Sequence, residues 1–184
     1  ADATYNTAIN LDKTNSDSWF SYASFLDRRK RYTEMLLVWR NIIDLPSVPL
    51  SSKIAIVESV TSKREFYRKN FLLIEPLVTR LYQLHPENAK VVDSYIGHLI
   101  AGNRVEEALV LLKERLDRSK PDEQEIGRII SIEQHLDRLD SVAVYADMGI
   151  HHYPTTEDFW NLPVPAKWRK WHCKRTQIPY LPCK

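Results

Sequence analysis

The sequence predicts an all-α protein built from antiparallel helix pairs, and three features support this fold class. The 184 residues include only four glycines, a composition that disfavours sandwiches and barrels with many tight turns. Apolar side chains recur three and four residues apart through most of the chain, which is helical spacing. Turns recur at an interval of about 34 residues, which is typical of proteins that stack similar helical units.

The interval is measured between the turns that end one helix and start the next. Lys120 lies midway between Pro86 and Pro154, and its separation from each equals the separation of Lys13 from Ser47. The interval from Ser47 to Pro86 is longer, so the second unit is longer than the others. The apolar faces between the turns predict helices at 2–12, 16–29, 32–45, 50–62, 66–84, 89–101, 104–118, 123–136 and 139–152, with a further helix starting near residue 156.

The helix at 16–29 shows the pattern most clearly. Trp19, Tyr22, Ala23 and Leu26 fall at positions i, i+3, i+4 and i+7, which lie on one face of a helix. Ser16 is a candidate N-cap, because its hydroxyl can accept a hydrogen bond from a free amide of the first turn. We therefore expect Trp19, and Trp39 in the next helix by the same reasoning, to lie in the core between neighbouring helices.

The long second unit contains a proline within the predicted helix 66–84. Pro76 interrupts the apolar run FLLIEPLVTRL. Proline removes one backbone donor and its ring clashes with the preceding turn. We therefore expect a kink or a break near Glu75.

These residues resemble the tetratricopeptide repeat over most of residues 1–160. Ala8–Asp12 with Asn15 and Trp19 is similar to the helix end, turn and aromatic restart of that motif, and Gly102–Ala108 is similar to its hairpin turn. The resemblance implies a right-handed superhelix whose concave groove, lined by the first helix of each pair, binds a protein or peptide partner. It implies no cofactor.

Mapped onto this chain, the groove positions are the residues of each first helix that do not point into the core. They are Asp17, Phe20, Ser24, Asp27, Lys90, Asp93, Gly97, Ile100, Gln124, Ser131 and Gln134. We expect Phe20 to be exposed and to anchor the partner, because aromatic side chains dominate protein interfaces. The three aspartates would favour a basic partner, whose binding weakens as salt screens the charges.

Two narrower resemblances point to different settings. The stretched second unit followed by LYQLHPEN resembles repeat proteins of bacterial cell envelopes, which implies the periplasm or the envelope. WFSYASFLD and VWRNII resemble the half-a-TPR repeats of RNA-processing scaffolds, which implies a scaffold associated with nucleic acid. A further alternative is a helper domain of an enzyme whose catalytic part lies on other sequence, since the first residues read as the end of a helix and the chain is expected to belong to a longer array.

Residues 161–184 differ from the repeats in composition and are expected to form a separate tail. The tail holds six of the 26 cations and no acid, which leaves 20 cations and 24 acids, a net charge of −4, in residues 1–160. It is also rich in proline and tryptophan. It is interpreted as a strip that binds nucleic acid or a membrane surface, as an extension outside the fold, or as a non-native segment. Removal of residues 163–184 is expected to leave the fold nearly intact.

Catalytic and metal sites are not predicted. The sequence contains no glycine-rich phosphate loop, and its cysteines and histidines lack the paired spacing of a zinc site. Ser94 and His98 are four residues apart on one predicted helix and are interpreted as a solvated surface pair. The sequence therefore predicts a binding scaffold rather than an enzyme.

Overall fold

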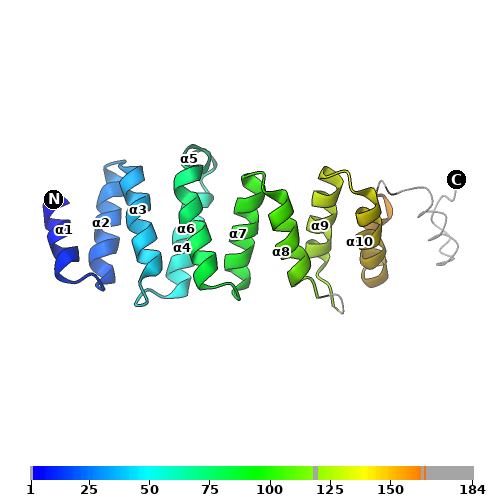
Figure 1. Ribbon diagram of the computed structural model, residues 1–184, viewed down its shortest axis with the longest axis horizontal. Helices are drawn as coiled ribbons and strands as arrows, with labels where there is room; N and C mark the ends of the chain where they lie inside the picture. The colour runs from blue at the N-terminus through cyan, green and yellow to red at the C-terminus, as the bar shows by residue number, and fades with distance from the viewer. Residues whose placement is uncertain (1, 118–119, 163, 165–184) are drawn as a thin grey trace, which may run out of the picture. The chain divides into compact units, whose positions relative to one another are not determined.

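The computed structural model describes residues 2–117, 120–162 and 164, and every regular element in this part of the chain is an α-helix (Figure 1). The chain divides into two compact units, Ala1–Gly102 and Asn103–Lys184. None of the helices within the described ranges is long and apolar enough to cross a membrane.

The first unit is a series of helices joined by short links. Its helices are α1 (Asp2–Leu11), α2 (Ser16–Arg28), α3 (Tyr32–Asp44), α4 (Leu50–Thr61), α5 (Arg64–Lys69), α6 (Phe71–Leu84) and α7 (Ala89–Ala101). Helix α2 packs against α3, α3 against α6 and α6 against α7, while α4 contacts both α6 and α7. Fully buried branched side chains, among them Leu26, Ile42 and Ile74, fill the space between these helices.

The second unit repeats this pattern on a smaller scale. Its helices are α8 (Val105–Arg115), α9 (Glu123–His135), α10 (Leu139–His152) and α11 (Glu157–Trp160). Helix α9 packs against α8 and α10, and α11 packs against α10. Leu112, Ile126 and Ile129 are fully buried there, together with one charged side chain, Glu133.

The first helices of the repeats begin at Asx residues with a common geometry. The side chains of Asn15, Asn88 and Asp122 accept hydrogen bonds from backbone amides two or three residues later and so cap α2, α7 and α9. This satisfies amide donors that have no partner inside the helix. The prediction that Ser16 caps α2 is wrong by one position, because Asn15 has the extended backbone of a cap and Ser16 is already helical.

The second helices of the repeats start from a different turn. Lys30, Asn103 and Asp137 adopt positive φ of 57°, 60° and 55°, and an arginine follows each of them. Asn103 and Asp137 are separated by the same interval as Pro86 and Lys120. A residue other than glycine is uncommon in the left-handed region and is slightly strained there. The recurrence of this conformation at the repeat interval therefore supports true repeats.

The long repeat between Ser47 and Pro86 is interrupted at Asn70, and not near Glu75 as expected. Helix α6 continues through Pro76, which is exposed in its second turn. The predicted helix 66–84 is instead divided at Asn70, whose side-chain amide donates to the carbonyl of Phe66 at 2.9 Å. Such a local side-chain bond to the backbone competes with helix continuation. A proline near a helix start removes few hydrogen bonds, which is why α6 tolerates it.

Two predictions about aromatic residues need correction in degree. Trp19 and Trp39 pack against the core of the first unit, as expected, but both are only partly buried. Phe20 was expected to be exposed, yet it is also half-buried, and its ring lies 5.8 Å from that of Trp39. His98, interpreted as a surface residue, is buried.

The predicted tail lies mostly outside the described residues. Of residues 161–184 only 161, 162 and 164 are described, and Val164 is buried. The separation of a tail at residue 161 and the effect of its removal remain predictions.

Candidate functional site

The candidate site is a cavity of about 380 Å³ in the first unit, between the α2–α3 hairpin and the segment formed by α4 and α5. We call it the α5 pocket. It is lined by Ser24, Asp27, Tyr32, Met35, Trp39, Ser59, Val60, Lys63 and Phe66. A volume of this size lies in the range of roughly 300–1,000 Å³ that is usual for ligand-binding clefts.

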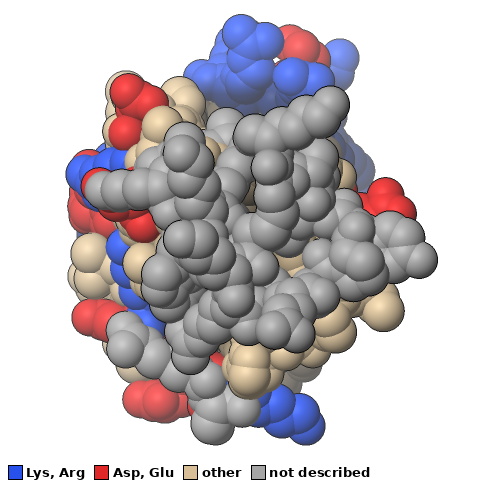
Figure 2. Space-filling model, turned by 90° about the vertical axis from the view of Figure 1, so that its right-hand side faces the viewer, with Lys and Arg blue, Asp and Glu red and all other residues tan. Residues whose placement is uncertain are grey.

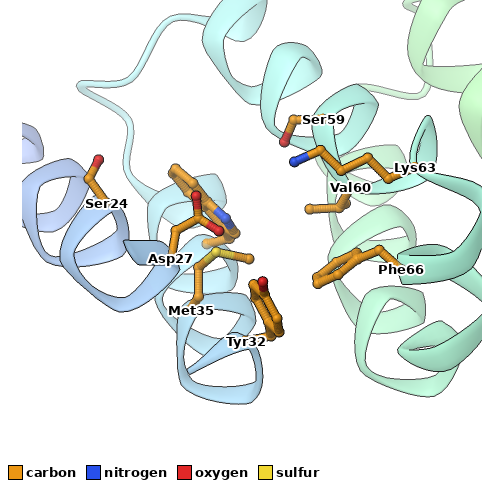
Figure 3. Close-up of a pocket in the computed structure, with 9 residues that line it drawn as sticks. Ser24, Asp27, Tyr32, Met35, Ser59, Val60, Lys63 and Phe66 are labelled. Atoms are coloured by element: carbon orange, nitrogen blue, oxygen red, sulfur yellow. The ribbon is translucent and has the colours of Figure 1, made fainter. Parts of the chain in front are cut away.

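The apolar part of the pocket comes from one face of α3 and from the far side of the cavity. Tyr32, Met35 and Trp39 are spaced three and four residues apart, so they project from the same side of α3. Phe66 faces them from α5, and its ring meets the ring of Tyr32 edge to face, with the centroids 5.0 Å apart (Figure 3). Val60 completes this surface and is buried.

The rim of the pocket is polar and carries both signs of charge. Asp27 of α2 lies on one side, and Lys63, the residue before α5, extends its amine from the opposite side (Figure 3). Both residues are exposed. Among the described residues neither side chain forms an ion pair, so both charges are available to a bound molecule. Ser24 and Ser59 add hydroxyl groups to the same rim.

Helix α5 belongs to the longer repeat between Ser47 and Pro86, and its two aromatic residues fix its place. Phe66 contacts Tyr32 at the start of α3, as above. Tyr67, its neighbour, points to α7, where its hydroxyl lies 2.7 Å from Nδ1 of His98. The ring of His98 stacks on Phe71 with the centroids 4.4 Å apart. Helix α5 is thereby held against α3 and α7, and burial raises the pKa of the Tyr67 hydroxyl.

The turn beside the pocket is fixed by a second set of contacts. Arg31 donates to both oxygens of Asp2 at 2.7 Å and also pairs with Glu34. Hydrogen bonds from Arg31 lower the pKa of both carboxyl groups. The contact of Nη1 of Arg31 with both carboxylate oxygens of Asp2 ties α1 to the α2–α3 turn. The wall formed by Asp27 and Tyr32 therefore has a defined position before any partner arrives.

The structure places the predicted groove residues on several surfaces. Ser24 and Asp27 line the α5 pocket. Phe20 does not line it, but its ring contacts the lining residue Trp39. The remaining positions are exposed or half-buried on α2, α7 and α9 and do not line this cavity: Asp17, Lys90, Asp93, Gly97, Ile100, Gln124, Ser131 and Gln134. Three of these, Gln124, Ser131 and Gln134, belong to the second unit.

Sequence reasoning missed most of the pocket lining. Trp39 was assigned to the core, and Tyr32, Met35, Lys63 and Phe66 were not among the predicted site residues. The available signal was the longer interval between Ser47 and Pro86, since additional residues in one repeat must form an additional structure. Within the described residues no group of three or more His, Cys, Asp or Glu is arranged to hold a metal ion.

Comparison with known proteins supports the fold. Searches against protein-family models and against curated proteins give no match to this chain. The solved structure of YrrB, described as a TPR protein with an unusual peptide-binding site, aligns with 94% of this chain and 86% of its own length. The TM-score is 0.50 and the sequence identity is 12%. At this identity the likeness concerns the fold alone, and it confirms the predicted all-α tetratricopeptide-like class.

Proposed function

We propose that this chain of tetratricopeptide-like fold is a scaffold that binds a peptide segment of a partner protein, and that the α5 pocket is where the segment binds. The observation that carries the proposal is the pocket itself, in which four large apolar side chains, Tyr32, Met35, Trp39 and Phe66, surround an open cavity. Aromatic residues and methionine are enriched where proteins bind other proteins.

The rim provides the polar contacts that a peptide needs. An extended or helical segment carries backbone amides and carbonyls as well as side chains, and these must keep hydrogen-bond partners when they leave water. Asp27 can accept from an amide, and Lys63 can donate to a carbonyl or a carboxylate. A large side chain of the partner would fill the cavity between them, as buried anchors do in other interfaces.

Two further points support this proposal. YrrB is described as having a peptide-binding site, so the fold is compatible with this function. The contacts of Phe66 and Tyr67 hold α5 in place before binding, and such preorganisation reduces the entropic cost of association. The pocket offers no nucleophile hydrogen-bonded to a base among its lining residues, and the proposal assigns no catalysis to the chain.

Selection from an unbiased library of displayed peptides tests the proposal. Peptides that bind the wild-type protein are measured again with Ser59→Trp, which places a large side chain at the rim of the pocket. Ser51→Trp is the matched control, because Ser51 is exposed on the same helix, α4, but does not line the cavity. Circular dichroism checks that both variants keep their helices.

The proposal predicts a selective loss. Ser59→Trp should weaken the selected peptides by about tenfold or more, equivalent to about 1.4 kcal/mol, and Ser51→Trp should leave their affinity unchanged. Equal binding to both variants would mean that peptides are captured elsewhere. A selection that enriches no peptide would exclude peptide binding as the function.

A further inference from the structure

The two chain segments beside the α5 pocket are unusually basic. Residues 27–31 contain four cations and one acid, and residues 63–69 also contain four cations and one acid, so together they carry a net charge of +6. Residues 1–160 as a whole carry −4. Positive charge is therefore concentrated in two short segments of an otherwise acidic body.

Most of these cations are free to meet a ligand. Seven of them are exposed and form no ion pair among the described residues, although one, Arg29, lies over the ring of Phe25 at 5.7 Å: Arg28, Arg29, Lys30, Lys63, Arg64, Arg68 and Lys69. Arg31 is the exception, because Asp2 and Glu34 neutralise it. Charges without an internal partner add to the local potential and attract ligands of opposite sign.

The two segments flank one cavity. Asp27 and Tyr32 form one wall of the α5 pocket, and Lys63 and Phe66 form the other, with the Tyr32 and Phe66 rings in contact. Figure 2 shows Lys and Arg side chains gathered at the upper edge of the molecule in that view. One of the cations, Lys63, therefore lines the cavity itself, and the others lie in the chain segments that contain its lining residues.

We propose that the α5 pocket selects an acidic peptide segment that carries one large apolar or aromatic side chain. The apolar side chain enters the cavity, and flanking Asp or Glu residues pair with Lys63, Arg64 and the cations of the α2–α3 turn. This inference rests on the proposed function and specifies its partner. It replaces the expectation of a basic partner, which considered Asp17, Asp27 and Asp93 without the cations that the fold places beside the cavity.

The negative charge of Asp27 on the rim favours a peptide over a nucleic acid as the ligand. The carboxylate of Asp27 lies on the rim without an ion-pair partner among the described residues. It can accept a hydrogen bond from a peptide amide, whereas it would repel a phosphate backbone. Nucleic-acid binding would require the positive surface to continue across the cavity.

Fluorescence anisotropy with synthetic probes tests the inference. The first probe is a labelled peptide of alternating Glu and Ser with one central Phe. The second replaces each Glu by Lys, the third replaces the Phe by Ala, and the fourth is a labelled single-stranded oligonucleotide. We expect the first probe to bind most tightly. Its affinity should fall as salt rises from about 0.01 M to about 0.1 M, because the Debye length shortens from about 30 Å to about 10 Å.

Charge-reversal variants locate the contact. The double variant Lys63→Glu with Arg64→Glu should weaken the acidic probe by about tenfold or more, because two attractive charges become repulsive. Arg40→Glu is the control, because Arg40 is exposed on α3 and does not line the pocket. It should weaken the acidic probe far less. All these side chains are exposed, so the variants should keep the wild-type melting temperature.

Each other outcome overturns a defined part of the account. Equal weakening by Arg40→Glu would show that only net charge matters and would refute a site at the pocket. Preference for the Lys probe, or for the oligonucleotide, would refute the acidic-peptide assignment. If library peptides depend on Ser59 but are basic, the proposed function stands and this inference fails. If no peptide depends on Ser59, both fail.

Discussion

Glu133 gives the clearest test of how the second unit is stabilised. Its carboxylate is fully buried, and it accepts hydrogen bonds from Nζ of Lys113 at 2.5 Å and from Oγ of Ser141 at 2.7 Å. Nη1 of Arg138 lies 3.8 Å from Oε2 of Glu133. Burial opposes ionisation, but the hydrogen bonds from Lys113 and Ser141 and the nearby positive charges outweigh it, so the pKa of Glu133 is lowered.

The substitution Glu133→Gln removes the charge and keeps the shape. A hydrogen bond to a charged group contributes about 1.5–3 kcal/mol. Lys113 keeps about a third of its side chain exposed, so its ammonium regains hydration when the carboxylate is lost, which favours the lower half of that range. We expect a loss of about 2 kcal/mol, or a drop of about 4–8 °C in the melting temperature.

The effect should depend on pH in a defined direction. A carboxyl with a lowered pKa stabilises the fold above its unfolded value, near 4.3, and this contribution disappears as the pH falls through the folded value. Thermal unfolding followed by circular dichroism at neutral and at acid pH measures it. Wild type and Glu133→Gln should differ at neutral pH and converge in acid.

The control is Glu106→Gln, which removes another partner of Arg138. This carboxylate is mostly exposed, and exposed ion pairs contribute little, so its melting temperature should stay close to wild type. A melting temperature for Glu133→Gln within about 1 °C of wild type at neutral pH, or the same shift for both variants, would refute the reasoning.

Two further predictions concern packing. A Cβ on Gly149 would lie 2.7 Å from ring atoms of Phe159, so Gly149→Ala should cost about 1–3 kcal/mol by overpacking. Gly127→Ala, where a Cβ meets nothing within 4 Å, should instead stabilise α9 by about 0.5–1 kcal/mol; chemical denaturation of both variants distinguishes the two signs. Because Trp19 and Phe20 are both half-buried against the core, alanine at either position should cost roughly 2–3 kcal/mol, somewhat less than for a fully buried ring. Wild-type stability of Phe20→Ala in the same assay would return Phe20 to the exposed surface that the sequence suggested.

The fold could be predicted from sequence because its signals are local. Apolar spacing located most of the helices to within a few residues, since an amphipathic helix shows its buried face in its own residues. The recurrence of turns at intervals of about 34 residues indicated that the helices form repeats. Helix ends were less certain: Asn15 caps α2 where Ser16 was proposed, because both side chains can accept the same kind of bond.

The site could be predicted only in part because it depends on contacts between distant residues. Ser24 and Asp27 were identified as non-core positions of α2, but the residues that face them come from α4 and α5. The division at Asn70 hid α5 inside a longer apolar pattern, where Pro76 gave the more obvious signal. The pairing of Tyr67 with His98 joins residues 31 positions apart, and no local pattern reveals it. A cell-envelope location remains a prediction from resemblance.

The two methionines provide the most direct measurement of the central claim. Met35 lines the α5 pocket, whereas Met148 lies on α10 in the second unit, and the chain contains no other methionine. In a protein labelled with ¹³C at the methionine methyl groups, NMR gives one signal for each, assigned with Met148→Leu. If the pocket binds a peptide segment, a peptide selected from the library should shift the Met35 signal in proportion to occupancy and leave Met148 unchanged. A bound peptide that leaves the Met35 signal in place would contradict the account.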